Sequence, residues 1–380
     1  MSATLNLPTS ARELLARATL ACVSVTPDKN GHVPPGACDA YYAYYPSFTI
    51  AAIFTGLFLG VTVAHIYEAF HHRKSFCTVI VMGALWEFAS FALRTLGTKQ
   101  QQNKTIAIVS FVLFTLAPLW INAFVYMVAG RLTFCFLPSR RVFGVQAIWI
   151  AKIFVLCDIL SFIVQAGGAL MISPGASETL KNTGLHIYQA GIGAQQAFIL
   201  LFFSILIGFH KKMSDMEKTG WRDSHRRAWK PMIWVLYLVL ALITVRIVYR
   251  LAEYLIGLDD SNPLPNHEVY MYTLDAVPML LALLVLIIVH PGRVLVGPGS
   301  NYRVEKKQLK AEKKAARKGR KQGKKDSGSN GDDEEEEEWL GLQTMPESSS
   351  NPAIYTPLSD GHGAEQGTNR RYYEINRVRI

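Results

Sequence analysis

The sequence has few charged residues for its length. Of 380 residues, 18% are Asp, Glu, Lys or Arg, whereas 50% are hydrophobic. The sequence also lacks the pattern G-x-x-x-x-G-K-[ST], whose backbone amides and lysine hold nucleotide phosphates. The missing nucleotide-binding pattern argues against a nucleotide-driven pump, so any transport by this chain is expected to be passive or ion-coupled.

Cysteine is scarce as well, and none of the five cysteines stands at a metal-ligand spacing. Cys22 and Cys38 both precede the first apolar run, and two alternatives are open for them: a disulfide bridge or two free thiols. No nucleophile or metal triad of a membrane hydrolase can be assembled from the sequence. We therefore predict that the chain is not an enzyme and has no cofactor.

Long apolar runs are abundant. Roughly 20 apolar residues in a helix span the hydrocarbon core of a bilayer, and only helices or closed barrels satisfy their backbone there. The sequence therefore predicts an all-α membrane protein, a bundle of seven transmembrane helices. The predicted helices cover about 46–68, 76–96, 105–129, 147–171, 184–209, 232–256 and 269–290.

Lysine and arginine are distributed unequally among the loops. The loops after the first, third and fifth helices contain 12 of them, and the loops after the second, fourth and sixth contain 3. Because cytoplasmic loops are enriched in these residues, segment 1–45 is predicted outside the cell and the C-terminus in the cytoplasm. Asn103 lies in an outer loop, so its Asn-Lys-Thr sequon is a glycosylation candidate, although the adjacent helix end argues against occupancy.

The polar tail after the membrane domain 46–292 is predicted to be disordered, because it has too few apolar residues to form a core. Its segment 303–325 contains twelve Lys or Arg, and 332–338 is entirely acidic. Anionic inner-leaflet lipid attracts each nearby basic residue by roughly 1 kcal/mol, so the basic run is predicted to bind the membrane surface rather than nucleic acid. Alternatively, the tail is a solubilising segment whose two charged runs pair with each other.

The sixth predicted helix carries three charged residues, Arg246, Arg250 and Glu253. At full depth they would cost roughly 8 to 10 kcal/mol, against roughly 4 to 8 kcal/mol from the helix's apolar residues. Their spacing of i, i+4 and i+7 places them on one face of the helix. These charges must therefore face protein or water.

Polar residues recur at helical spacing on other predicted helices. With the predicted orientation, they converge on a cavity in the outer half of the bundle. The candidate cavity residues are Glu87, Arg94, Asp158, Gln165, Gln195, Gln196, Arg246, Arg250, Glu253, Tyr272 and Asp275. Alternatively, pairs such as Glu87 with Arg94 and Arg250 with Glu253 only fix helix packing.

A second polar cluster ends the first predicted helix. It consists of His65, Glu68, His71 and His72. A metal ion needs ligands on converging elements, and here one helix end supplies them all. We interpret this group as a solvated cluster and predict no metal site.

The motifs resemble those of the fungal lipid-translocating exporter family, the resistance-to-aminocholesterol type that includes a yeast exporter of sphingoid long-chain bases. The resemblance runs through the membrane domain, one motif per helix. The motifs include YYPS at 44–47, WEFASFALR at 86–94, CDILSFIVQAGG at 157–168, RIVYRLAEYLIG at 246–257 and HPG at 290–292. The family usually has Gly-Tyr where this chain has Ser90 and Phe91, so no tyrosine hydroxyl is available there.

The resemblance implies a plasma-membrane exporter of sphingoid-base-like or sterol-like amphipathic lipids that confers resistance to toxic lipophilic molecules. The polar head of the lipid would bind the cavity carboxylates Glu87, Asp158, Glu253 and Asp275, while its apolar tail stays in the bilayer. The alternative is a seven-helix lipid-sensing receptor of the G protein-coupled type. The topology fits a receptor, but Arg131 has no acidic residue before it and the last helix lacks an Asn-Pro-x-x-Tyr turn.

Overall fold

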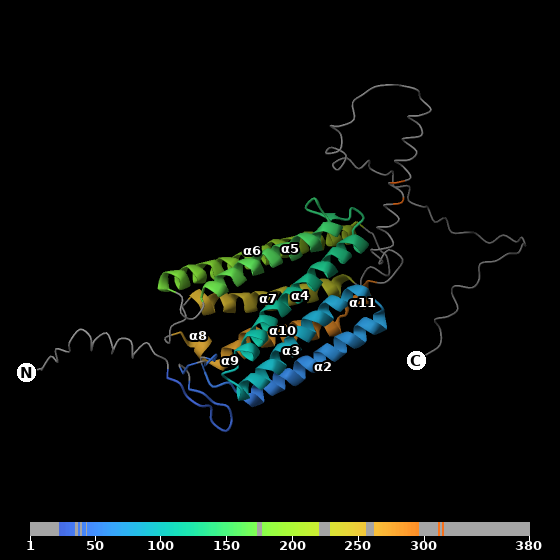
Figure 1. The fold of residues 1–380 in the computed structure, drawn as a ribbon. Coiled ribbons are helices and arrows are strands. Elements are labelled where there is room, and N and C mark those ends of the chain that lie inside the picture. The colour runs from blue at the N-terminus through green and yellow to red at the C-terminus, as the bar shows by residue number, and fades with distance from the viewer. Residues whose placement is uncertain are drawn as a thin grey trace, which may run out of the picture. The chain divides into compact units, whose positions relative to one another are not determined.

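The structure, a computed structural model, describes most of the membrane domain (Figure 1). The described residues are 23–34, 37–38, 40–42, 44–172, 177–219, 229–255 and 262–295, with isolated positions at 311 and 314. The chain divides into two units, residues 1–309 and 310–380, and every element below belongs to the first. Cys22 and nearly all of the predicted tail, including its acidic run 332–338, lie outside the described residues.

The described part of the chain contains seven spans that are long and apolar enough to cross a membrane. This confirms the predicted all-α fold with seven apolar helices. Six of the spans are formed by α2 (Phe48–His72), α3 (Thr78–Lys99, preceded by the 3-10 turn η1, Ser75–Cys77), α4 (Lys104–Phe136), α5 (Ala147–Met171), α6 (Glu178–Lys218) and α7 (Trp229–Leu255).

The seventh span, Glu268–Val294, is not one regular helix. It follows the short α8 (Pro263–Asn266) and consists of α9 (Glu268–Met271), the π-helical turn η3 (Tyr272–Ala276), α10 (Val277–Ile288) and α11 (Pro291–Val294). Pro278 has no N–H to donate to the carbonyl one turn earlier, so the regular ladder is interrupted there. Single π turns of this kind widen a helix locally and are frequent at functional sites.

Several helices begin at a side-chain cap. Asn103 Oδ1 accepts a hydrogen bond from Ile106 N at 3.2 Å, and Ser177 Oγ accepts one from Leu180 N at 3.3 Å. Each cap satisfies one of the backbone donors that a helix start leaves without a partner. The sequon residue Asn103 is thus part of the start of α4.

Helix α6 extends beyond its predicted end at residue 209 and reaches Lys218. Its 41 residues measure about 60 Å, roughly twice the hydrocarbon thickness. The extension packs beside a small antiparallel hairpin of β1 (Arg141–Val142) and β2 (Val145–Gln146). Lys212 Nζ donates to the Arg141 carbonyl at 3.0 Å, which ties the two elements together.

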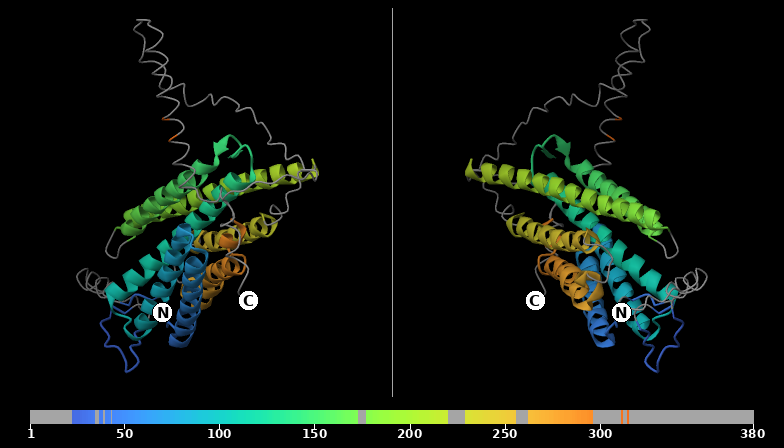
Figure 2. Two further views of the ribbon diagram at one scale, coloured as in Figure 1. Left: turned by 90° about the vertical axis from the view of Figure 1, so that its right-hand side faces the viewer. Right: turned by 90° about the vertical axis from the view of Figure 1, so that its left-hand side faces the viewer.

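The helices form a closed bundle (Figure 2). Consecutive helices pack against each other from α2 to α7, and α10 closes the bundle by contacting both α7 and α2. We call the end of the bundle at Tyr41, Tyr42 and Tyr44 the tyrosine end. The opposite end, where α2 finishes with His71 and His72, is the histidine end.

Helices α5 and α6 approach each other closely at glycines. A Cβ on Gly168 would lie 2.6 Å from both the Gly184 carbonyl oxygen and the Tyr188 backbone nitrogen. Gly167, next in the chain, has nothing within 4 Å of its Cβ position. Gly168, which faces α6, is therefore required for this packing, whereas Gly167 is not.

Candidate functional site

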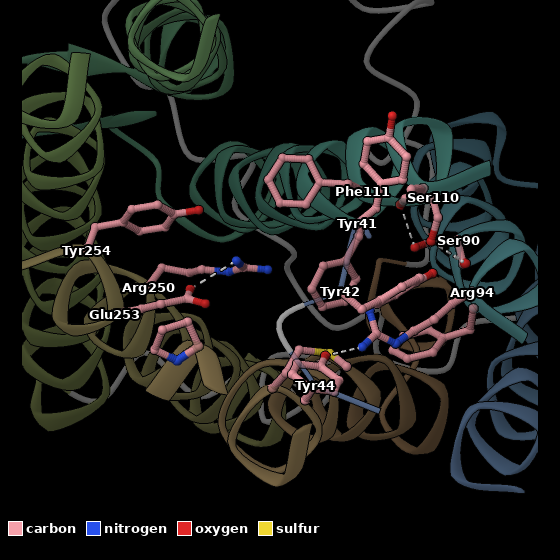
Figure 3. Close-up of a pocket in the computed structure, with 15 residues that line it drawn as sticks. Tyr41, Tyr42, Tyr44, Ser90, Arg94, Ser110, Phe111, Arg250, Glu253 and Tyr254 are labelled. Carbon is pink, nitrogen blue, oxygen red and sulfur yellow. Dashed lines mark hydrogen bonds and ion pairs between the residues drawn. The ribbon is translucent and has the colours of Figure 1, made fainter. Parts of the chain in front are cut away.

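A pocket of about 240 Å³ lies at the tyrosine end (Figure 3). The segment before α2 forms one wall, α3 and α4 form a second, and α7 with α8 and α9 completes the enclosure. Its lining residues are Tyr41, Tyr42, Tyr44, Ser90, Phe91, Arg94, Ala107, Ser110, Phe111, Phe114, Arg250, Glu253, Tyr254, Pro265 and Met271. The pocket thus combines tyrosine rings, two arginines and one carboxylate.

Arg94 organises the tyrosine wall. Its guanidinium donates a hydrogen bond to the Tyr44 hydroxyl and lies 5.7 to 5.9 Å from the ring centroids of Tyr42, Tyr44 and Tyr272. Burial raises the pKa of the Tyr42 and Tyr44 hydroxyls, which keeps both neutral beside the arginine. A cation over several aromatic faces is attracted by their ring quadrupoles. Arg94 therefore anchors the segment that closes the pocket.

Glu268 completes this anchor. Its Oε2 accepts a hydrogen bond from the Ser47 backbone N–H at 2.9 Å, and its Oε1 lies 3.8 Å from Arg94. The first turn of the seventh span is thereby joined to the start of α2. Arg94 therefore contacts Tyr44 and Glu268, and not Glu87, the partner that the packing alternative gave it.

A network of ion pairs forms the floor of the pocket. Arg250 Nε lies 2.6 Å from Asp275 Oδ2, and Arg250 Nη1 lies 3.1 Å from Glu253 Oε2. Arg246 Nε lies 2.5 Å from the other oxygen of Asp275. Asp275 has no exposed surface. One buried carboxylate on the π-helical turn therefore pairs with two arginines of α7, and Glu253 supplies the second negative charge of the network.

Ser90 and Phe91, where the motif departs from its usual Gly-Tyr, both have defined contacts. Ser90 Oγ donates to the Ser110 carbonyl at 2.8 Å, and Ser110 Oγ donates to the Ser90 carbonyl at 3.0 Å. Phe91 stacks on Phe58 with ring centroids 5.0 Å apart. These contacts hold α3 against α4 and α2 beside the pocket.

A second, much smaller cavity of about 20 Å³ adjoins the floor. Gln165 and Gln195 line it and are joined by a hydrogen bond of 3.0 Å, from Gln165 Nε2 to Gln195 Oε1. Arg250 lines both cavities. A space of this size can hold a water molecule when polar groups surround it. Gln196 lines neither cavity.

Two of the predicted carboxylates, Asp158 and Glu87, do not line the pocket. Asp158 Oδ2 accepts hydrogen bonds from Asn122 Nδ2 at 3.0 Å and from the Tyr126 hydroxyl at 2.9 Å, in a separate network between α4 and α5. Glu87 is fully buried, and neither of its oxygens has a hydrogen-bond partner among the described residues, although it interacts electrostatically with Arg246, Asp275 and Arg250. The predicted polar residues therefore form several sites rather than one cavity.

Tyr42, Tyr44 and Glu268 belong to the site but were not among the residues predicted from the sequence. The dense run of tyrosines at 41–45 was a signal for the two tyrosines, since Tyr is enriched where a chain meets the membrane–water interface. Cys38, in the same segment, is disulfide-bonded. Its predicted partner, Cys22, lies outside the described residues.

Comparisons with known proteins agree with the helix pattern. Residues 80–297, more than half of the chain, match the family described as RTA1 like protein. The chain is 40% identical to the probable lipid transporter atnI of Emericella nidulans over 315 residues, which is 81% of each chain. It is 27% identical to Protein RTA1 of Saccharomyces cerevisiae, over 66% of this chain and 84% of that protein.

A further relative is the sphingoid long-chain base transporter RSB1 of Saccharomyces cerevisiae. It is 25% identical over 285 residues, which is 65% of this chain and 72% of that protein. No solved structure matches the chain significantly.

Proposed function

The chain belongs to the RTA1-like family of membrane lipid transporters, and from this premise we propose that the pocket at the tyrosine end receives the polar head of an amphipathic lipid. The protein is a multi-pass integral membrane protein, and the family consists of transporters rather than enzymes. We propose sphingoid-base-like or sterol-like amphiphiles as substrates, because one relative is named as a sphingoid long-chain base transporter.

The size of the pocket supports binding of a head group rather than a whole lipid. Pockets that enclose drug-sized ligands measure roughly 300 to 1,000 Å³, whereas this one measures about 240 Å³. Phe111 lines the pocket and is 44% exposed, so one wall of the pocket reaches the lipid-facing surface of α4. The apolar tail would leave beside Phe111 and remain in the bilayer.

The position of Glu253 is the main support for this proposal. Among the described residues that line the pocket it is the one carboxylate, and it contacts Arg250 through a single interaction at 3.1 Å. Arg250 also has Asp275 at 2.6 Å. Glu253 can therefore turn to a cationic head group while Arg250 keeps its contact with Asp275, which it shares with Arg246.

We further propose that the tyrosine end faces the outside of the cell, at the plasma membrane. The unequal distribution of Lys and Arg among the loops supports this orientation. The basic run 303–325 would then lie in the cytoplasm, where it would bind anionic lipid. Glycosylation or protease mapping of intact cells tests the orientation independently of transport.

The decisive experiment is a flux assay with the purified full-length chain in proteoliposomes. Labelled sphingoid bases are added with and without a proton gradient, and empty liposomes serve as the control. Flux above that of empty liposomes supports the proposal, and its dependence on the gradient separates passive from ion-coupled movement. Saturable lipid binding without any flux would favour the receptor alternative and overturn the proposal.

A further inference from the structure

Three possible metal ligands meet at the histidine end, far from the proposed head-group pocket. Glu68 and His72 lie one turn apart on α2, and His290 directly precedes α11. Glu68 Oε2 lies 2.9 Å from His72 Nε2 and 3.8 Å from His290 Nδ1. The three ligand atoms all lie within 4.8 Å of one another. The fold therefore brings residues from the first and last spans to one point.

The cluster is not the solvated group that the sequence suggested. Glu68 is 7% exposed and His290 is 1% exposed. Among the described residues, Glu68 Oε2 and His72 Nε2 have only each other at 2.9 Å and the neighbouring His290 Nδ1, which lies 3.8 Å from Glu68 Oε2. Buried polar atoms usually have at least one hydrogen-bond partner, and here the available partners are the other potential ligand atoms. A cation between these atoms would satisfy both of them.

The donor set and its spacing fit a transition-metal ion. Zn²⁺ binds imidazole nitrogen and carboxylate oxygen at about 2.0 to 2.2 Å, so tetrahedral ligand atoms lie about 3.4 Å apart. The separations of 2.9 and 3.8 Å lie on either side of that value, so binding requires only small side-chain movements. Imidazole and carboxylate ligands together suit Zn²⁺ better than Mg²⁺ or Ca²⁺.

The surroundings orient the three ligands. Arg293 Nη2 donates to Glu68 Oε1 at 2.9 Å, which leaves Oε2 for the histidine side of the cluster. Cys77 Sγ lies 3.6 Å from His290 Nε2, so the ring has a partner on the nitrogen that faces away from Glu68. Outer contacts of this kind fix the orientation of a metal-binding histidine. The Gly292 N–H donates to His290 Nδ1 at 3.1 Å and would give up this acceptor to the ion.

Gly292 makes room for the cluster. A Cβ at this position would lie 2.6 Å from His72 Cγ and 2.8 Å from His290 Nδ1. Any side chain there would therefore push the two imidazoles apart. The motif His290-Pro291-Gly292 thus supplies both a ligand and the space that the other histidine needs.

We propose that Glu68, His72 and His290 form a divalent metal site, best suited to Zn²⁺, that links α2 to α11. Three protein ligands leave a fourth position for water. The sequence alone argued against a metal because one helix end provided every candidate ligand. His290, which lies 218 positions after His72, removes that objection. The ion would fix the end of the seventh span to the first helix.

The test uses the purified full-length chain without a histidine tag, stripped of metal and titrated with Zn²⁺. We expect one Zn²⁺ per chain and a rise in thermal midpoint on binding. His72→Ala and His290→Ala should each weaken the affinity by at least about 100-fold. His71→Ala is the matched control, because His71 is exposed beside His72 and is not one of the three ligands. It should bind Zn²⁺ as the parent chain does.

A measurement on the unmodified chain covers the case in which a ligand variant fails to fold. X-ray absorption of the Zn²⁺-loaded protein should show nitrogen and oxygen ligands with two imidazoles and no sulfur. Sub-stoichiometric binding, a sulfur ligand from Cys77, or unchanged affinity in folded His72→Ala would each overturn the proposal.

Discussion

Arg250 Nε lies 2.6 Å from Asp275 Oδ2, and this ion pair joins α7 to the π-helical turn of the seventh span. The second oxygen of Asp275 lies 2.5 Å from Arg246 Nε, so both arginines depend on the same carboxylate. Glu253, the third charged residue of α7, is an additional partner of Arg250. Asp275 therefore has a structural role, and Glu253 remains available for a ligand.

Asp275→Asn should destabilise the bundle. The change leaves Arg246 and Arg250 buried without their main counter-charge, and removal of one partner of a buried ion pair typically costs about 3 to 5 kcal/mol. Unfolding of the purified variant in detergent should show this loss. Glu178→Gln is the control, because its carboxylate is 83% exposed and Lys181 is its only ion-pair partner among the described residues. Parent-like stability of Asp275→Asn would contradict the assigned role.

Glu253→Gln should impair transport while the fold is kept. The amide preserves an acceptor for Arg250, which also retains Asp275, but it removes the negative charge from the pocket. A hydrogen bond to a charged group contributes about 1.5 to 3 kcal/mol, so the substrate concentration for half-maximal flux should rise about 10- to 100-fold. Flux in proteoliposomes and thermal unfolding are measured on the same preparation. Full flux in the folded variant would exclude Glu253 as the head-group receptor.

Tyr44→Phe should loosen the wall of the pocket without removing its aromatic surface. The hydroxyl that accepts from Arg94 is lost, and the remaining acidic partner, Glu268, lies 3.8 Å away. Hydrogen exchange around residues 40–47 should become faster, and flux should fall. Tyr45→Phe is the control, because Tyr45 is 56% exposed and its ring lies near His32 instead. Equal exchange in the two variants would show that the Arg94 contact does not hold the segment.

Gly168→Ala should separate α5 from α6. The added methyl group would meet backbone atoms of Gly184 and Tyr188 at 2.6 Å, and backbone cannot move aside as a flexible side chain can. Overpacking of this kind costs about 1 to 3 kcal/mol. Gly167→Ala should be neutral or stabilising, because its methyl group meets nothing and alanine favours a helix by up to about 1 kcal/mol. Thermal unfolding of the two variants distinguishes a close helix contact from a general effect of glycine loss.

The sequence predicted the order and number of the helices. The predicted ends coincide with the observed ones for α5 and differ by at most three residues for α7. The largest difference is at α6, whose last residue is Lys218 rather than residue 209. Hydropathy marks where lipid ends, and a polar helix can continue beyond that point when it packs against another element. Contact with the β1–β2 hairpin provides that support for α6.

The sequence predicted only some of the residues that form the site. The face shared by Arg246, Arg250 and Glu253 is set by helical spacing, and Asp275 was among the expected partners. Glu87 was expected beside them as well; it interacts electrostatically with Arg246, Arg250 and Asp275, but its oxygens have no hydrogen-bond partner among the described residues. Tyr44 and Glu268 were absent from the expected site because their roles depend on how the segment before α2 folds back onto the seventh span.

The sequence by itself determined that this chain is a seven-helix membrane protein and that the charges inside its helices must be paired, because lipid rejects both exposed backbone and isolated charge. Only the tertiary structure decided which residues meet: Asp275 with two arginines, Arg94 with three tyrosine rings, and His290 with Glu68. Spacing along a helix defines the face on which a side chain lies. The rotation, depth and bending of the neighbouring helices decide what that face contacts.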